Sequence, residues 1–166
     1  MSTLHDRDLL AEAVAMREAG QVEEAKRLLL DLHTQSPDDP IINLQCAWAH
    51  DKLGLEAEAV PFYEAAVRLG LDGEDLRSAL LGLGSTYRTL GRYDDALATL
   101  TRGVETFPDD PSMQVFRAMA LYNNGKPKEA CQVLLQIVSD TTSDEGIRSY
   151  RAAIDIYAAD LDRTWS

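Results

Sequence analysis

Residues 83–100 read LGSTYRTLGRYDDALATL, and this stretch decides the fold. Large apolar side chains recur at helical spacing, but Gly91 interrupts them, and a glycine inside a helix costs about 1 kcal/mol relative to alanine. Two helices that meet at Gly91 explain the pattern better than one interrupted helix. Gly84 and Ala96 on either side of the turn are small, as expected where two antiparallel helices cross at short distance.

The same landmarks recur along the chain, with spacings of 34, 37 and 34 residues. A repeated period of this length predicts an array of similar helix hairpins. The three additional residues fall in LGLDGEDL, residues 69–76. The landmarks are the turn glycines Gly20, Gly54, Gly91 and Gly125, the alanines Ala25, Ala59, Ala96 and Ala130, and the small residues Ala13, Ala47, Gly84 and Ala118.

Each unit is therefore predicted to be a helix, a glycine turn and a second helix. SPDDP (36–40) and FPDDP (107–111) are near-copies that join consecutive units, with aspartates to cap the next helix and a proline for its first turn. We expect first helices at about 5–19, 40–53, 74–90 and 111–124, and second helices at about 21–35, 55–69, 93–106 and 127–139.

The chain end adds one more element. Ile147, Tyr150, Ile154, Tyr157 and Leu161 recur at helical spacing, which predicts a ninth helix at about 144–162 that covers the open end of the fourth unit. The expected fold is all-α: a right-handed α-solenoid of four helix hairpins plus a C-terminal capping helix. It forms one domain over 1–166, with units at about 6–39, 40–73, 77–110 and 111–142.

Composition narrows the function. The net charge is −12, from 16 basic and 28 acidic residues, and this field opposes nucleic acid as a partner. No apolar run is long enough to cross a membrane, and MSTLHDRDLL carries charges where a signal peptide is apolar, so we expect a cytoplasmic protein without a membrane partner. Cys46 and Cys131 lie in apolar helical contexts and are expected as buried free thiols.

The third unit resembles the tetratricopeptide-repeat family. The resemblance extends over about residues 6–142, with Leu80 standing where the family prefers tryptophan. More narrowly, LGSTYRTLGRYDDAL resembles a group of small bacterial members of unassigned activity. Leu100 and Gly103 are variants within the family's range, and the matching residues are Leu83, Gly84, Tyr87, Gly91, Tyr93, Ala96 and Pro108.

The resemblance implies that the first helix of every unit lines a concave groove. An apolar groove with a polar rim favours a protein or peptide partner. Two alternatives stay open: individual aliphatic residues belong to a core shared by neighbouring units, or a second copy of the chain fills the groove as a homodimer. The repeat register assigns to this partner-binding face Leu10, Val14, Arg17, Leu44, Trp48, Lys52, Leu81, Ser85, Arg88, Val115, Met119 and Tyr122.

Some family members bind a chaperone's terminal carboxylate through basic and amide side chains at set groove positions. Here those positions hold Leu10, Val14, Gln45, Ser78 and Gly82, so that activity is not expected. Arg17, Lys52 and Arg88 lie on one side of the groove. They are suited to an acidic ligand, and equally to a solvated rim.

No catalytic constellation is recognisable. Ser85, Thr86 and Ser143 have no identifiable histidine partner, and the acidic pairs stand at helix starts, where the helix dipole stabilises them. The histidines have no metal-ligand spacing, so we expect no enzyme, cofactor or metal. The leading hypothesis is an interaction scaffold that binds a peptide or helix, with self-association as an additional hypothesis. The alternatives are an acidic export chaperone, or a fragment of an enzyme or regulator.

Overall fold

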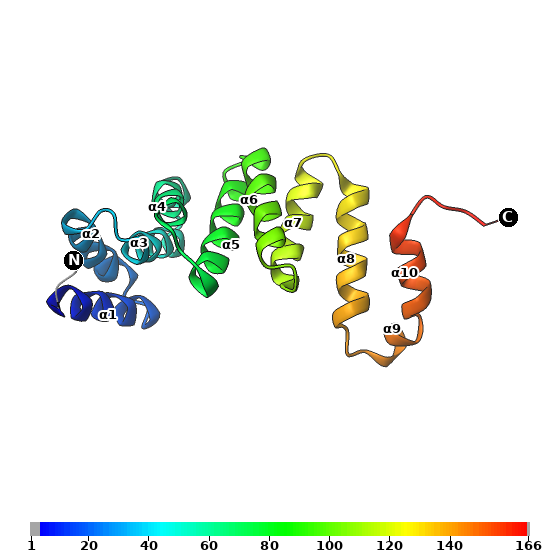
Figure 1. Ribbon diagram of the computed structural model, residues 1–166, viewed down its shortest axis with the longest axis horizontal. Helices are drawn as coiled ribbons and strands as arrows, with labels where there is room; N and C mark the ends of the chain where they lie inside the picture. Colours follow the sequence, from blue (N-terminus) through cyan, green and yellow to red (C-terminus); the bar gives the residue numbers. More distant parts are fainter. Residues whose placement is uncertain (1–3, 166) are drawn as a thin grey trace. The chain divides into compact units, whose positions relative to one another are not determined.

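The computed structural model describes residues 4–165, and the helices within this range confirm the all-α prediction; no strand occurs there (Figure 1). Helix boundaries agree with the sequence to within a few residues up to the fourth hairpin. The ten helices of the described chain are α1 (Leu4–Glu18), α2 (Val22–Gln35), α3 (Pro40–Lys52), α4 (Glu56–Leu69), α5 (Gly73–Thr89), α6 (Tyr93–Thr106), α7 (Pro111–Asn123), α8 (Pro127–Thr141), α9 (Glu145–Ser149) and α10 (Arg151–Ala159).

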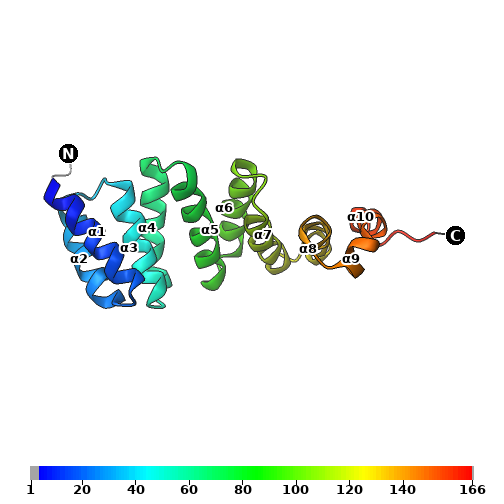
Figure 2. The same ribbon diagram turned by 90° about the horizontal axis from the view of Figure 1, so that it is seen from below.

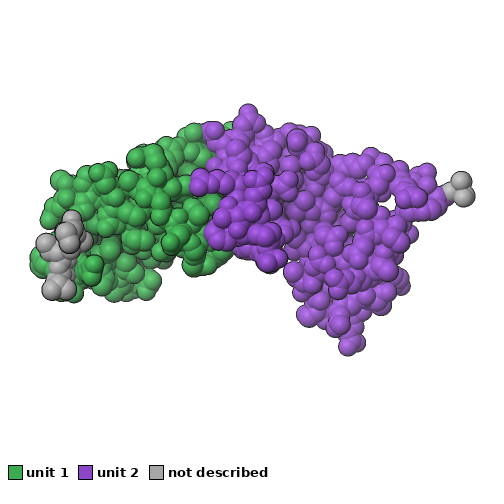
Figure 3. Space-filling view, viewed as in Figure 1, with its two compact units in different colours: residues 1–92 green, residues 93–166 purple. Residues whose placement is uncertain are grey.

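The chain forms two compact units, coloured separately in Figure 3. Unit 1 is Met1–Arg92 and contains α1 to α5; unit 2 is Tyr93–Ser166 and contains α6 to α10. The boundary falls in the turn after Gly91, in the middle of the repeat expected at 77–110. A single domain over 1–166 stays a prediction, and the two units are described separately below.

The four predicted turn glycines all adopt the left-handed backbone conformation. Their φ angles lie between 70° and 87°. In each turn the residue after the glycine donates its N–H to a carbonyl five residues back, as in Gln21 to Met16 at 2.9 Å and Leu55 to His50 at 3.0 Å. The glycine itself bonds three residues back. This is the Schellman arrangement, so the glycine landmark ends the first helix of each hairpin.

The two near-copied linkers cap their helices as predicted. Asp39 Oδ1 accepts the N–H groups of Ile41 and Ile42 at 2.9 and 3.1 Å, and Pro40 opens α3. Asp110 Oδ1 accepts the corresponding groups at the start of α7, where Pro111 is the first residue. Proline is tolerated there because the first N–H groups of a helix have no intrahelical acceptor.

The small residues of the repeat pattern are buried within their units. In unit 1, α1 packs on α2 and α3 packs on α4, and each pair lies side by side in Figures 1 and 2. In unit 2, α7 packs on α8. Side chains no larger than a methyl group let these helix axes approach. The fully or almost fully buried alanines are Ala13, Ala25, Ala47, Ala59, Ala96, Ala118 and Ala130; Gly84 is also buried.

The C-terminal helix differs from its prediction. Instead of one helix, the chain forms α9, a break at Tyr150 and then α10. Of these two helices, α10 packs against α8, with Ala158 buried and the Ser139 hydroxyl bonded to Asp155. The capping role is therefore carried by α10. Helix α9 is not among the helices that pack on α8. Packing on α8 therefore does not hold α9 in line with α10.

The expectation for the cysteines is half right. Cys46 is buried in the unit 1 core, where its thiol lies 3.5 Å from the Leu29 carbonyl oxygen, whereas Cys131 is exposed. Ala130 faces into the hairpin, and the next residue of a helix is turned away by about 100°. An apolar sequence context alone therefore does not determine whether Cys131 lies on the buried or the exposed face of α8.

Candidate functional site

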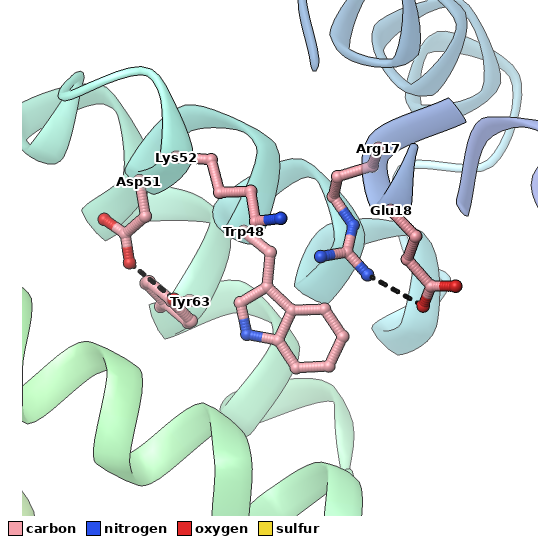
Figure 4. A pocket seen from close by; sticks show the side chains of 6 residues that line it. All are labelled: Arg17, Glu18, Trp48, Asp51, Lys52 and Tyr63. Atoms are coloured by element: carbon pink, nitrogen blue, oxygen red, sulfur yellow. Dashed lines mark hydrogen bonds and ion pairs between the residues drawn. The ribbon is translucent and has the colours of Figure 1, made fainter. Parts of the chain in front are cut away.

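Unit 1 carries an open pocket of about 430 Å³ on one side of its first two hairpins (Figure 4). Two of its lining residues lie on α1, three on α3 and one, a tyrosine, on α4. The side chains that line the pocket are Arg17, Glu18, Trp48, Asp51, Lys52 and Tyr63.

Arg17 and Trp48 form the centre of the pocket. The Arg17 guanidinium carbon lies 5.1 Å from the Trp48 ring centroid, within the range of a cation–π interaction. The Arg17 side chain is only 11% exposed, yet its Nε is buried without a hydrogen-bond acceptor. Its nearest carboxylate is Glu18 at 3.8 Å, a contact to a side chain that is 67% exposed. Arg17 is thus held in place by stacking, with its hydrogen-bonding capacity largely unused.

The Asp51 carboxylate is not available to a ligand in the same way, because side chains from two neighbouring helices already hydrogen-bond to its oxygens. The Tyr63 hydroxyl donates to Oδ2 at 2.6 Å, and Thr86 Oγ1 lies 3.1 Å from both carboxylate oxygens. Burial raises the pKa of the Asp51 carboxyl above its ordinary value, and these two hydrogen bonds act in the opposite direction. Burial and the hydrogen bond to Asp51 likewise raise the pKa of the Tyr63 phenol. The group links α3, α4 and α5.

Position 82 on α5 makes this link possible. A Cβ atom at Gly82 would lie 2.5 Å from the Tyr63 hydroxyl oxygen and 2.7 Å from the ring carbon that bears it. Heavy atoms do not approach that closely without displacement. The glycine therefore leaves the space through which Tyr63, itself 1% exposed, reaches Asp51.

The structure places most of the predicted face of unit 1 at least partly in solvent. Lys52 is exposed, Leu44 is buried, and the other predicted face residues of unit 1 are half-buried. Leu44 is 0% exposed, so its assignment to the partner-binding face is wrong. Its helix, α3, packs against α1, α2, α4 and α5, which leaves little of its surface free. The half-buried residues are Leu10, Val14, Arg17, Trp48, Leu81, Ser85 and Arg88.

Unit 2 carries the remaining predicted residues on α7. Val115 is half-buried, Met119 is 37% exposed and Tyr122 is 67% exposed. Their spacing of four and three residues puts them along one side of that helix. They form a separate candidate surface on unit 2.

Sequence reasoning did not assign Tyr63 to the site, since the groove was assigned to the first helix of every unit and Tyr63 lies on a second helix. A signal was nevertheless present: Gly82 lies inside a helix, away from any turn. A glycine at such a position often marks the close approach of another group. Nothing in the sequence identified Tyr63 as that group.

The comparisons with known proteins agree with this geometry. A family model described as "Tetratrico peptide repeat" matches residues 40–161, most of the chain. The chain belongs to the tetratricopeptide-repeat (TPR) family. The resemblance in the third unit is therefore confirmed, and it extends to the C-terminal helices. Membership of this family indicates a scaffold for protein–protein interaction.

Individual relatives of this TPR protein are distant. Superkiller protein 3 of Saccharomyces cerevisiae is 22% identical over 116 residues, which are 66% of this chain and 8% of that protein. The chain thus spans less than a tenth of that relative's length.

Solved structures show the same fold at low identity. YrrB, described as a TPR protein with an unusual peptide-binding site, superposes with a TM-score of 0.73 at 20% identity, covering 93% of this chain and 77% of YrrB. A MamA double mutant gives 0.77 at 17% identity, covering 96% and 88%. MamA from Desulfovibrio magneticus RS-1 gives 0.72 at 18% identity, covering 98% of both chains.

Between Leu4 and Trp165 no helix combines the length and the apolarity that crossing a membrane requires.

Proposed function

We propose that this TPR protein binds a peptide or helix of a partner protein on the exposed face of its first helices. On unit 1 the face comprises Leu10, Val14, Arg17, Trp48, Lys52, Leu81, Ser85 and Arg88; on unit 2 it comprises Val115, Met119 and Tyr122. The observation that carries the proposal is the position of Trp48, which lines an open pocket while the residues next to it on α3 are buried.

A partly exposed tryptophan in a concave site is an effective anchor for a partner. Tryptophan, tyrosine and arginine are the residues whose truncation most often costs an interface more than about 2 kcal/mol. Trp48 and Arg17 provide two of these types in one pocket, already stacked on each other. The stacked pair loses little side-chain freedom on binding, so its contacts contribute to affinity with a small entropic cost.

The test is affinity capture from the native organism with the wild-type chain and two single variants, Trp48→Ala for unit 1 and Met119→Ala for unit 2. Tyr150→Ala is the matched control, since Tyr150 is 68% exposed and lies outside both proposed surfaces. Partners captured by the wild type and by Tyr150→Ala should be lost or strongly reduced with Trp48→Ala. Circular dichroism checks that each variant keeps its helix content. Unchanged capture by both face variants would refute the proposal.

Self-association is part of the same proposal, and its candidate surface is the outer side of α10. Ile156, Tyr157 and Trp165 are each more than half exposed and line a pocket of about 280 Å³ with Ala153. Exposed apolar groups gathered in this way favour contact with another protein surface. Sedimentation at micromolar concentration should show a dimer that Tyr157→Ser weakens. A chain that is monomeric at all concentrations would remove this part of the proposal.

A further inference from the structure

We propose that the α1/α3 pocket recognises an acidic segment of its partner, with an Asp or Glu carboxylate held by Arg17 and Lys52 and a neighbouring apolar side chain on Trp48. This inference rests on the proposed function, because it names the chemistry of the segment that the pocket binds.

Apart from the exposed Glu18 carboxylate, the hydrogen-bonding groups that the pocket offers are donors. Arg17 Nε makes no hydrogen bond and is buried, so a ligand reaches the terminal guanidinium nitrogens, of which Nη2 lies 3.8 Å from Glu18 Oε1. The carboxylate of Asp51 is already used by Tyr63 and Thr86. A guanidinium and an ammonium group can only donate, so a complementary ligand must supply acceptors.

The positive charges of Arg17 and Lys52 also favour an acidic ligand. Figure 4 shows the ends of Arg17 and Lys52 directed toward the space beside the Trp48 ring, with Glu18 on the outer side of Arg17. Two cations near one another repel, and the repulsion is strongest where burial reduces the solvent's screening. A carboxylate between them offsets this repulsion. A basic ligand increases it, although the chain as a whole carries a charge of −12 and attracts basic partners at long range.

The geometry of Arg17 favours a carboxylate over a neutral acceptor. Its guanidinium carbon lies 5.1 Å from the Trp48 ring centroid, so the planar guanidinium is held beside the indole. A planar fork of donors fits the two oxygens of a carboxylate, and hydrogen bonds between charged groups are about twice as strong as neutral ones. The apolar face of the indole lies next to this fork, so an acidic residue beside an aliphatic or aromatic one matches both.

Arg88 supports a preference for more than one acidic residue in the bound peptide. It occupies the position on α5 that Arg17 occupies on α1 in the repeat register, and its Nε is also buried without an acceptor. Its side chain is half-buried in unit 1. A peptide along this face therefore meets a second half-buried guanidinium.

The experiment uses the full-length protein, immobilised, and a phage library of random dodecapeptides. Sequences recovered by the wild type are compared with those recovered by Arg17→Gln, Lys52→Gln and Trp48→Ala. Arg27→Gln is the matched control: Arg27 is an exposed cation on α2 that makes no ion pair within the described residues. Synthetic peptides from the recovered set are then titrated by fluorescence anisotropy, each beside a version with Glu→Gln or Asp→Asn.

We expect recovered peptides to pair Asp or Glu with a neighbouring Leu, Phe or similar residue. Amide replacement in the peptide and Arg17→Gln should each weaken binding by about tenfold or more. Combining the two changes should weaken binding no further than either alone, because both remove the same interaction. Arg27→Gln should leave binding unchanged. Raising the salt concentration should weaken the binding of the acidic peptide and leave the binding of its amide version almost unchanged.

Three results would overturn the inference, and they separate it from the proposed function. Peptides that require Trp48 but show no acidic preference refute the inference and leave the proposed function standing. A recovered set that never depends on Trp48 refutes both for unit 1. A dimer in sedimentation that Arg17→Gln dissociates assigns the pocket to a second copy of the chain and also refutes the inference.

Discussion

The Tyr63 hydroxyl donates a 2.6 Å hydrogen bond to the Asp51 carboxylate, and the ring reaches that carboxylate because position 82 has no side chain. The bond joins the two helices of the second hairpin, and Thr86 extends it to the first helix of the third. All three residues are at least half-buried. Asp51 and Tyr63 also line the Trp48 pocket, so this polar link joins α3, which carries Trp48, to α4 and α5.

Replacing Gly82 with alanine should destabilise unit 1. Alanine gains about 1 kcal/mol of helix propensity over glycine, but its methyl group would displace the Tyr63 ring and break the bond to Asp51. Overpacking of this kind costs about 1–3 kcal/mol and the lost hydrogen bond about 1 kcal/mol more, so after the propensity gain we expect a net loss of roughly 1–3 kcal/mol in the free energy of unfolding. Urea denaturation followed by Trp48 fluorescence measures it, with Trp165 replaced by phenylalanine.

Gly103→Ala is the matched control. A Cβ atom there would lie 2.5 Å from the sulfur of Met113, the same close approach as at Gly82. Methionine has several rotatable bonds and adapts, whereas the tyrosine ring is rigid and hydrogen-bonded. Gly103→Ala should therefore cost less in unit 2 than Gly82→Ala costs in unit 1. Equal or reversed losses would show that the Tyr63 contact is not decisive.

Asp51 should make stability fall as the pH rises. Its pKa in the folded protein is raised, so between its unfolded and folded pKa values the folded state binds more protons than the unfolded state. Stability contributed by Asp51 is then greatest at low pH and decreases as the pH passes through this window. Asp51→Asn removes the titration and keeps an acceptor for Tyr63. The variant should gain stability relative to wild type between pH 4 and pH 7.

Urea denaturation of both proteins at the two pH values checks this. The other titratable groups are the same in wild type and variant, so the difference between their unfolding free energies isolates Asp51. A variant that instead loses stability relative to wild type on going from pH 4 to pH 7 would contradict the raised pKa.

The repeated backbone features were predictable from sequence because they depend on local chemistry. A left-handed turn selects glycine, a helix start selects aspartate and proline, and both signals recur at fixed spacing. Gly54 and Asp39 could therefore be assigned without knowing any neighbour in space. Family membership followed from the same spacing.

The site was less predictable because it depends on which groups meet across helices. The register placed Leu44 on the exposed face, but α3 packs against four other helices and no face of it stays free at that position. It also assigned the groove to first helices alone, which left out Tyr63 on α4, although the Tyr63 hydroxyl bonds to Asp51. The break at Tyr150 has the same origin, since helical periodicity does not reveal that α9 has no partner on α8.

Gly54→Ala should destabilise unit 1 through the backbone alone. Gly54 has a φ of 70°, and a Cβ atom there would meet nothing within 4 Å, so no steric contact adds to the effect. Left-handed backbone costs a residue with a side chain about 1–2 kcal/mol. Asparagine tolerates this conformation better, so Gly54→Asn should lose less than Gly54→Ala in urea denaturation. Equal stability of the wild type and both variants would show that the turn relaxes to another conformation.

The two thiols should differ sharply in reactivity. Burial raises the pKa of the Cys46 thiol to about 12, whereas Cys131 is exposed on α8. At pH 8 only about one Cys46 side chain in ten thousand is then the reactive thiolate, and the core around it also blocks the reagent. A disulfide reagent such as dithionitrobenzoate should label one thiol per chain rapidly and the second only when denaturant is added. Cys131→Ser should abolish the rapid phase and leave the slow one intact. Rapid labelling of two thiols in the native wild type would mean that the core around Cys46, which includes Ala13 and Leu29 from the first hairpin, opens far more readily than its packing implies.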